Sequence, residues 1–114
     1  MAIINITKNT IISHSYKKCY SVWQHARGLM FTLKPKCLVF VLRKEQKISL
    51  HMWFVFYPID VIFLDNNKEV IETIEKFMPF SFYSSKTKCR YIIELPQGSI
   101  KNSNTWIGDK VEFH

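Results

Sequence analysis

The chain has 114 residues, enough to bury one hydrophobic core and too few for two, so we expect a single domain over residues 1–114. Hydrophobic residues make up 47% of the chain, with only three Gly and four Pro, and this composition excludes a disordered or fibrous protein. The formal net charge is +7, but 13 of the 16 basic residues are Lys. This balance indicates a solvated basic surface more than one that reads bases with Arg forks.

Eight segments are predicted to be strands, because β-branched and aromatic residues gather there between turn residues. In chain order they span residues 2–7, 10–13, 37–42, 48–56, 59–64, 69–77, 89–95 and 110–113. The intervening sequence predicts a charged connection at 43–47, a long loop over 78–88 and a single helical turn after Gly98. Strands joined by short turns favour a mainly β fold, either a small antiparallel β-barrel or a sandwich.

One short helix is predicted near residues 21–28. Ser21 can cap its first turn by accepting a backbone hydrogen bond, and Gly28 can end it in left-handed geometry without a Cβ penalty. Between them Val22 and Ala26 recur at helical spacing, which is typical of a buried helix face.

The densest apolar run of the chain covers residues 51–65 and is predicted to form two strands. Pro58 cannot donate to a sheet ladder, and it pushes Tyr57 away from helical geometry, so we expect a corner there. The run ends at a turn over residues 65–67, because Asp and Asn side chains bond their own backbone and tolerate positive φ.

The strand over residues 89–95 is predicted to have two distinct faces. Tyr91, Ile93 and Leu95 should point to one side of the sheet, and Ile92 and Glu94 to the other.

Several kinds of site have no sequence signal. The three cysteines are odd in number and far apart, so we expect reduced and mostly buried thiols. The four histidines are scattered, and we expect neither a metal nor a cofactor. No apolar run approaches the ~18 residues of a membrane span, and the first residues do not resemble a signal peptide. We therefore expect a cytoplasmic protein, most simply a monomer.

Four blocks of residues together resemble the domain of unknown function 192, also called uncharacterised protein family 0127. They are Arg27-Gly28-Leu29-Met30, then Met52-Trp53 with the segment from Pro58 to Asp65, then the segment from Tyr91 to Gly98, and finally Gly108-Asp109-Lys110-Val111. The resemblance implies a small, β-rich, barrel-like domain with a short helix and no established reaction. Family members often place a Lys or similar polar residue soon after the Met-Trp pair, whereas Phe54, Val55 and Phe56 follow it here. The segment between Gly98 and Gly108 also departs from the pattern, because it is rich in Ser, Asn and Lys.

The recognisable blocks suggest a candidate site formed by Arg27, Trp53, Asp60 and Glu94. An isolated buried carboxylate is costly, so Asp60 and Glu94 should be exposed at strand ends or paired, with Arg27 as the obvious cation. One interpretation is an ion network that fixes the fold. The other is a cleft that binds a small molecule or a peptide, with Trp53 and Tyr57 as a stacking wall.

Two further functions stay open from the sequence. Exposed loop aromatics beside Lys86, Lys88 and Arg90 could bind single-stranded nucleic acid by stacking and charge. Asp60 and Glu94 could serve a carboxylate-dependent hydrolase, which requires a suitable separation between the two carboxyl groups. Neither a nucleophile elbow nor a phosphate-binding loop accompanies these residues, so we expect a non-enzymatic binding module.

Overall fold

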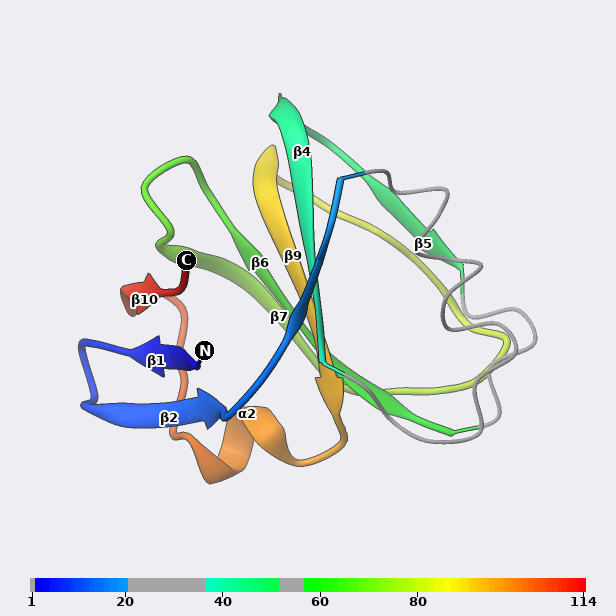
Figure 1. Ribbon diagram of the computed structural model, residues 1–114. Coiled ribbons are helices and arrows are strands. Elements are labelled where there is room, and N and C mark those ends of the chain that lie inside the picture. The colour runs from blue at the N-terminus through cyan, green and yellow to red at the C-terminus, as the bar shows by residue number, and fades with distance from the viewer. Residues whose placement is uncertain (1, 21–36, 52–56) are drawn as a thin grey trace.

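The protein, seen in a computed structural model that describes residues 2–20, 37–51 and 57–114, is built mainly from β-strands (Figure 1). The strands are β1 (Ile3–Asn5), β2 (Thr10–Ser13), β3 (Lys17–Cys19), β4 (Leu38–Gln46), β5 (Ser49–His51), β6 (Ile59–Leu64), β7 (Val70–Phe77), β8 (Phe82–Ser84), β9 (Cys89–Pro96) and β10 (Val111–Glu112). One short helix, α2 (Ser99–Asn102), lies between β9 and β10. The predicted mainly β fold is confirmed. Among the described strands no sheet closes into a barrel, so the arrangement is sandwich-like.

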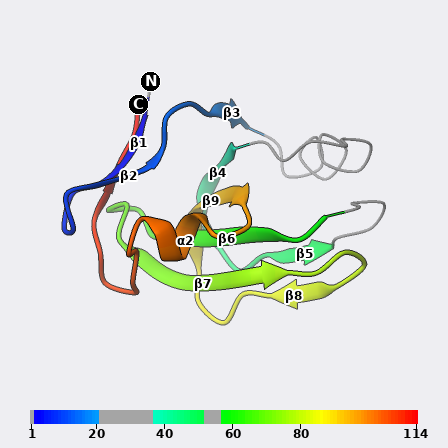
Figure 2. The same ribbon diagram turned by 90° about the horizontal axis from the view of Figure 1, so that it is seen from below.

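A five-stranded sheet in the order β3-β4-β9-β6-β7 forms the centre of the molecule. A three-stranded sheet, β10-β1-β2, lies against one of its faces, and the two-stranded sheet β5-β8 adjoins the other, as Figure 2 shows. No helix in the described part of the chain is long and apolar enough to cross a membrane.

Strand β9 is the middle strand of this sheet and pairs antiparallel with β4 and with β6. Its alternate residues enter two separate cores. Ile92 packs with Phe40 and Phe63 on the face towards β5-β8, whereas Ile93 and Leu95 pack on the face towards the three-stranded sheet. The predicted alternation along residues 89–95 is therefore confirmed. Burying each such side chain stabilises the fold by roughly 1.5–3 kcal/mol.

The β6-β7 hairpin confirms the second of the two strands predicted for the central apolar run, whereas residues 52–56 of the first lie outside the described residues. All six residues of β6 are buried, and the turn follows it directly. Asp65 Oδ1 accepts hydrogen bonds from the backbone N–H groups of Asn67 (2.8 Å) and Glu69 (3.0 Å). The positive φ of 60° falls on Lys68 and not on one of the two Asn residues.

Three segments differ from the expected strand boundaries. Strand β3, which pairs in parallel with β4, was not predicted, because Lys17 and Lys18 interrupt any apolar alternation. Strand β4 continues through the charged residues up to Gln46 by means of a bulge. Strand β8 lies inside the segment that was expected to be a long loop. It was not predicted, because Tyr83 is the only aromatic residue of this strand that packs inward, and one such residue is too short a pattern to indicate a strand. The helix predicted at 21–28 lies outside the described residues.

The buried carboxylate of Asp109 links the first hairpin, β1-β2, to the segment before β10. Its Oδ2 accepts hydrogen bonds from Asn5 Nδ2 (2.9 Å) and from the backbone N–H of Trp106 (2.9 Å), and it forms an ion pair with Lys8 Nζ (2.9 Å). Burial alone would raise the pKa of Asp109, but these donors outweigh burial and hold the pKa below its ordinary value. The closing strand β10 is thereby attached to the first hairpin.

We expect Asp109→Ala to lower the free energy of unfolding by on the order of 3 kcal/mol, because it removes one acceptor of the buried Asn5 amide, the acceptor of the Trp106 N–H and the ion-pair partner of Lys8. The contribution of Asp109 should be present above the ordinary carboxyl pKa of 3.8 and be lost as the pH falls through the lower folded pKa. Urea unfolding at pH 7 and at pH 3 measures both effects, and Glu112→Gln, at an exposed acid of β10, is the control. An Asp109→Ala protein that unfolds at the same urea concentration as the parent would contradict the assignment.

Candidate functional site

Four acidic side chains are buried in the described structure, and the carboxylates of three of them accept several hydrogen bonds from described residues. They are Asp60, Glu72, Glu94 and Asp109. Glu72 shows the usual arrangement: its carboxylate accepts from Tyr83 Oη (2.6 Å) and from backbone N–H groups in the loop before β9. Burial would raise the pKa of Glu72, but these bonds outweigh it and lower the pKa.

Asp60 is likewise occupied by backbone groups. Its Oδ2 accepts hydrogen bonds from the N–H groups of Gly98 (3.1 Å) and Ile100 (3.0 Å), at the start of α2. Its Oδ1 accepts from the N–H of Lys76 (3.0 Å), at a bulge of β7 where φ is 55°. Asp60 therefore fixes two neighbouring segments to β6.

Glu94 is the exception among the buried acids. It lies on β9 opposite Leu38 of β4 and Val61 of β6, and only 5% of its surface is exposed. Its Oε2 accepts no hydrogen bond from the residues that the structure describes. Burial raises the pKa of Glu94 to about 8, because a charged carboxylate there would lose its hydration and gain no donor from the described part of the chain.

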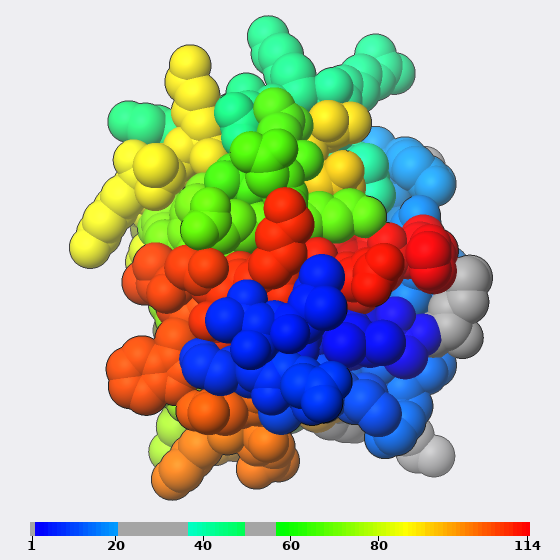
Figure 3. Space-filling model, turned by 90° about the vertical axis from the view of Figure 1, so that its left-hand side faces the viewer, coloured from blue at the N-terminus to red at the C-terminus, as the bar shows by residue number. Residues whose placement is uncertain are grey.

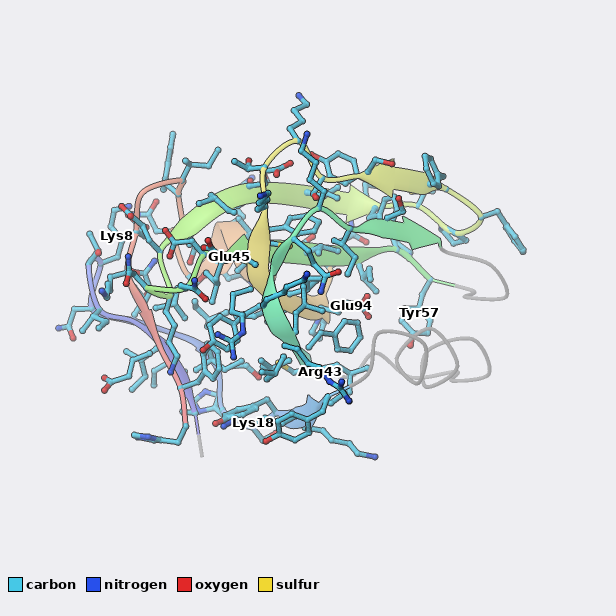
Figure 4. All side chains as sticks on the ribbon, turned by 90° about the horizontal axis from the view of Figure 1, so that it is seen from above. Lys8, Lys18, Arg43, Glu45, Tyr57 and Glu94 are labelled. Carbon is cyan, nitrogen blue, oxygen red and sulfur yellow. The ribbon has the colours of Figure 1, made fainter. Side chains whose placement is uncertain are left out.

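Tyr57 and Cys19 are the titratable neighbours on which Glu94 acts. The pKa of Tyr57 is raised first by burial and then by the negative charge of Glu94. The pKa of Cys19 is raised by burial, lowered in part by Lys17 and raised again by Glu94. In Figure 4, Glu94 and Tyr57 are on the same side of the sheet, far from Lys8.

An open hollow of about 440 Å³ lies at the end of the sheet, and Glu94 itself is not among its lining residues. Two of its lining residues are neighbours of Glu94 in the sheet: Leu38 is the pairing partner on β4, and Pro96 lies two residues farther along β9. The rest of the lining comes from Ser13, Ser15, Tyr16, Lys17 and Cys37. The hollow thus brings hydroxyl, ammonium and thiol groups close to the end of the strand that carries Glu94.

The structure separates the two acids that the sequence placed in one cleft. Asp60 lies on the sheet face of Ile62 and Leu64, which packs against the three-stranded sheet, whereas Glu94 lies on the face of Ile92. The two carboxyl groups therefore do not flank a common substrate, as glycosidase chemistry requires. Arg27 and Trp53, the other two predicted site residues, lie outside the described residues. The predicted contact between Arg27 and either acid stays a prediction.

Sequence reasoning named Glu94 and Tyr57 but missed Cys19 and the hollow. Cys19 was expected to be a buried thiol, and it is a half-buried free thiol, as is Cys37, whereas Cys89 is fully buried. The parallel pairing of β3 with β4 places Cys19 beside Phe40, and no local pattern in the sequence indicates that pairing. Within the described residues, no group of three His, Cys, Asp or Glu is arranged to hold a metal ion.

We expect Asp60→Ala to destabilise the fold by on the order of 3 kcal/mol, because it leaves three backbone N–H groups without their acceptor. Amide hydrogen exchange should become faster at Gly98, Ile100 and Lys76. The N–H of Val111, which donates to the Lys68 carbonyl, is the internal control. Unchanged exchange at the first three amides would show that Asp60 does not hold these segments.

We expect the free energy of unfolding to fall as the pH rises from about 4.5 to about 8, because the folded protein retains a proton on Glu94 that the unfolded chain releases. The slope contributed by Glu94 is at most about 1.4 kcal/mol per pH unit. Glu94→Gln should remove this slope and be more stable than the parent at pH 8, whereas Glu69→Gln, at an exposed acid, should keep it. Urea unfolding across this range is the measurement, and a parallel pH dependence in parent and Glu94→Gln would refute the assignment.

Comparisons with known proteins agree with the resemblance seen in the sequence. Residues 4–113 match the model of the family DUF192, described as Uncharacterized ACR. A UPF0127 protein of Thermococcus sibiricus is 38% identical over 97% of this chain and 73% of its own length. A UPF0127 protein of Pyrococcus horikoshii is 36% identical over 97% of each chain.

Two solved structures share the fold. One is a Sinorhizobium meliloti protein proposed to be a transcription regulator, with a TM-score of 0.85 and 20% identity over 97% of this chain and 89% of that one. The other is a protein of unknown function from Novosphingobium aromaticivorans, with a TM-score of 0.83 and 18% identity over 98% of this chain and 82% of that one. At these identities the likeness shows the fold alone. The match over residues 4–113 and the UPF0127 relatives establish that this chain belongs to the DUF192 family of uncharacterised proteins.

Proposed function

We propose that this chain is a non-enzymatic binding module that holds a small molecule or a peptide segment at Glu94. The observation that carries the proposal is the buried Oε2 of Glu94, which accepts no hydrogen bond from the described residues. Leaving a buried polar group without a partner costs about 1–3 kcal/mol. A ligand that donates a hydrogen bond to this oxygen would remove that cost on binding.

The protonation state of Glu94 indicates the class of ligand. With a pKa of about 8, the carboxyl group is mostly protonated at neutral pH, so it can donate one hydrogen bond and accept another. An amide or a peptide group has the complementary donor and acceptor. We therefore propose an uncharged amide as the group that Glu94 recognises.

The surroundings of Glu94 support a ligand of modest size. The hollow of about 440 Å³ is within the range of small-molecule sites, and its lining includes Leu38, the pairing partner of Glu94, together with Tyr16 and Lys17. Tyr57 offers an aromatic ring on the same side of the sheet. Arg27 and Trp53 stay proposed ligand contacts, whereas the bonds that Asp60 makes to α2 and β7 favour a supporting role for it.

The proposal predicts that amide-bearing probes raise the melting temperature through Glu94. N-methylacetamide and glycylglycine amide are the probes, and n-butylamine tests whether a cation binds instead. Glu94→Met, which removes the hydrogen bonds but keeps the side-chain length, should abolish the shift. Glu94→Gln should keep at least half of it, because an amide also donates and accepts.

Glu69→Gln is the matched control and should respond like the parent protein. An equal shift in Glu94→Met and in the parent would show that the probes bind elsewhere. A crystal structure with glycylglycine amide then locates the contact. Density for the probe away from Glu94 would also overturn the proposal.

A further inference from the structure

The two-stranded sheet β5-β8 presents a continuous polar face to solvent. Its register pairs Ser49 with Ser84, and the two hydroxyl oxygens lie 3.2 Å apart, so both side chains point to the same side. Both residues are exposed, whereas Tyr83, the next residue along, points inward to Glu72 and Phe63. The side chains on this outer face are therefore two residues apart along each strand.

Lysines extend this face beyond the serine pair. The next pair in the register is Ile48 with Ser85, where the Ser85 N–H donates to the Ile48 carbonyl (2.8 Å) and the Ile48 N–H donates to Ser85 Oγ (2.9 Å). Lys47 and Lys86 come next to this pair, one on each of the two neighbouring segments, and both are exposed. Like charges on adjacent strands repel one another, so the binding of an anion between Lys47 and Lys86 is favoured.

The loop after β8, which carries Lys86 and Lys88, is fixed by hydrogen bonds from its backbone to Glu72. The backbone N–H groups of Lys86 and Thr87 donate to the buried carboxylate of Glu72, which fixes the loop while leaving the ammonium group of Lys86 outside. Lys88, two residues farther on, is exposed as well. In Figure 3, side chains from the end of β4 and from the loop before β9 project from the same end of the molecule.

An aromatic ring lies at the other end of the same face. Phe82 precedes Ser84 by two residues on β8 and is 59% exposed. Its spacing places it on the outer side of the strand with Ser84. We name this surface the ribbon face, and it consists of Lys47, Ser49, Phe82, Ser84 and Lys86, with the exposed Lys88 of the adjoining loop at its border.

We infer that the ribbon face binds single-stranded nucleic acid. The three lysines contact phosphate groups, the two serine hydroxyls donate to phosphate or sugar oxygens, and Phe82 stacks on one base. This surface includes Lys86 and Lys88 from the sequence hypothesis but not Arg90. The guanidinium of Arg90 instead donates to the Leu42 carbonyl and to Asn66 Oδ1 (3.1 Å).

Single strands fit this face better than duplexes do. Stacking on Phe82 requires a base whose ring surface is accessible, which a paired and stacked duplex does not offer in its interior. The face also has no Arg, the residue that most often reads guanine in the major groove. Binding should therefore be tolerant of sequence and be driven by charge and stacking.

Fluorescence anisotropy with a labelled 12-nucleotide oligothymidylate tests the inference with the whole chain. The parent should bind at 50 mM salt and lose about twentyfold in affinity by 200 mM, since three phosphate contacts give a logarithmic salt slope of about −2. The double variant Lys47→Gln, Lys86→Gln should bind at least tenfold more weakly and show a slope of about −0.7. Phe82→Ala should weaken binding about tenfold at every salt concentration without changing the slope.

The charge-matched control is the double variant Lys101→Gln, Lys110→Gln, which removes two exposed lysines from α2 and from the residue before β10. It should bind like the parent, and circular dichroism should show all variants folded. Equal losses in both double variants would mean nonspecific charge attraction and would overturn the inference. So would absence of binding at 50 mM salt, equal affinity for a 12-base-pair duplex, or binding to phosphatidylserine vesicles but not to the oligonucleotide.

Discussion

The burial of β9 on both faces is the constraint on which the rest of the structure depends. Its neighbours β4 and β6 satisfy its backbone groups, and apolar residues from two separate cores cover its side chains. Any polar side chain on such a strand must find a partner on its own face or remain unpaired. Glu94 is in this position, and the ladder that pairs it with Leu38 and Val61 places an aliphatic residue on each side.

The other buried acids show how the fold normally satisfies a carboxylate. Asp60, Glu72 and Asp109 each accept at least two backbone N–H groups or a combination of backbone and side-chain donors, and each fastens a loop or a short element to a strand. Those bonds lower the pKa of Glu72 and Asp109 in spite of burial. The pKa of Glu94 moves in the opposite direction, because burial acts on it without such donors among the described residues. The binding role proposed for Glu94 rests on this difference, since perturbed carboxyl groups gather at functional sites.

The sequence predicted the parts of the fold that local patterns decide. Strand β6 and the turn after it follow from a β-prone run and from the Asx chemistry of Asp65. The bulge in β4 depends on its pairing with the distant strand β9, and the parallel pairing of β3 depends on β4, so no short pattern contains them. The same limit applies to the site. Alternation placed Asp60 with Ile62 and Glu94 with Ile92, but only the β6-β9 register shows that these are opposite faces of one sheet.

The two proposed surfaces lie near opposite ends of β9. The ribbon face adjoins the loop that leads into Cys89, and the hollow adjoins Pro96, which is seven residues farther along the strand, or roughly 24 Å at 3.4 Å per residue. Between these ends, β9 is hydrogen-bonded on both edges and packed on both faces, so a rearrangement of β9 would have to disrupt two cores. Energetic coupling between distant sites requires an element with two arrangements that both sites can bias. We therefore expect a ligand at Glu94 and a nucleic acid on the ribbon face to bind independently, because the strand between the two surfaces is packed on both faces.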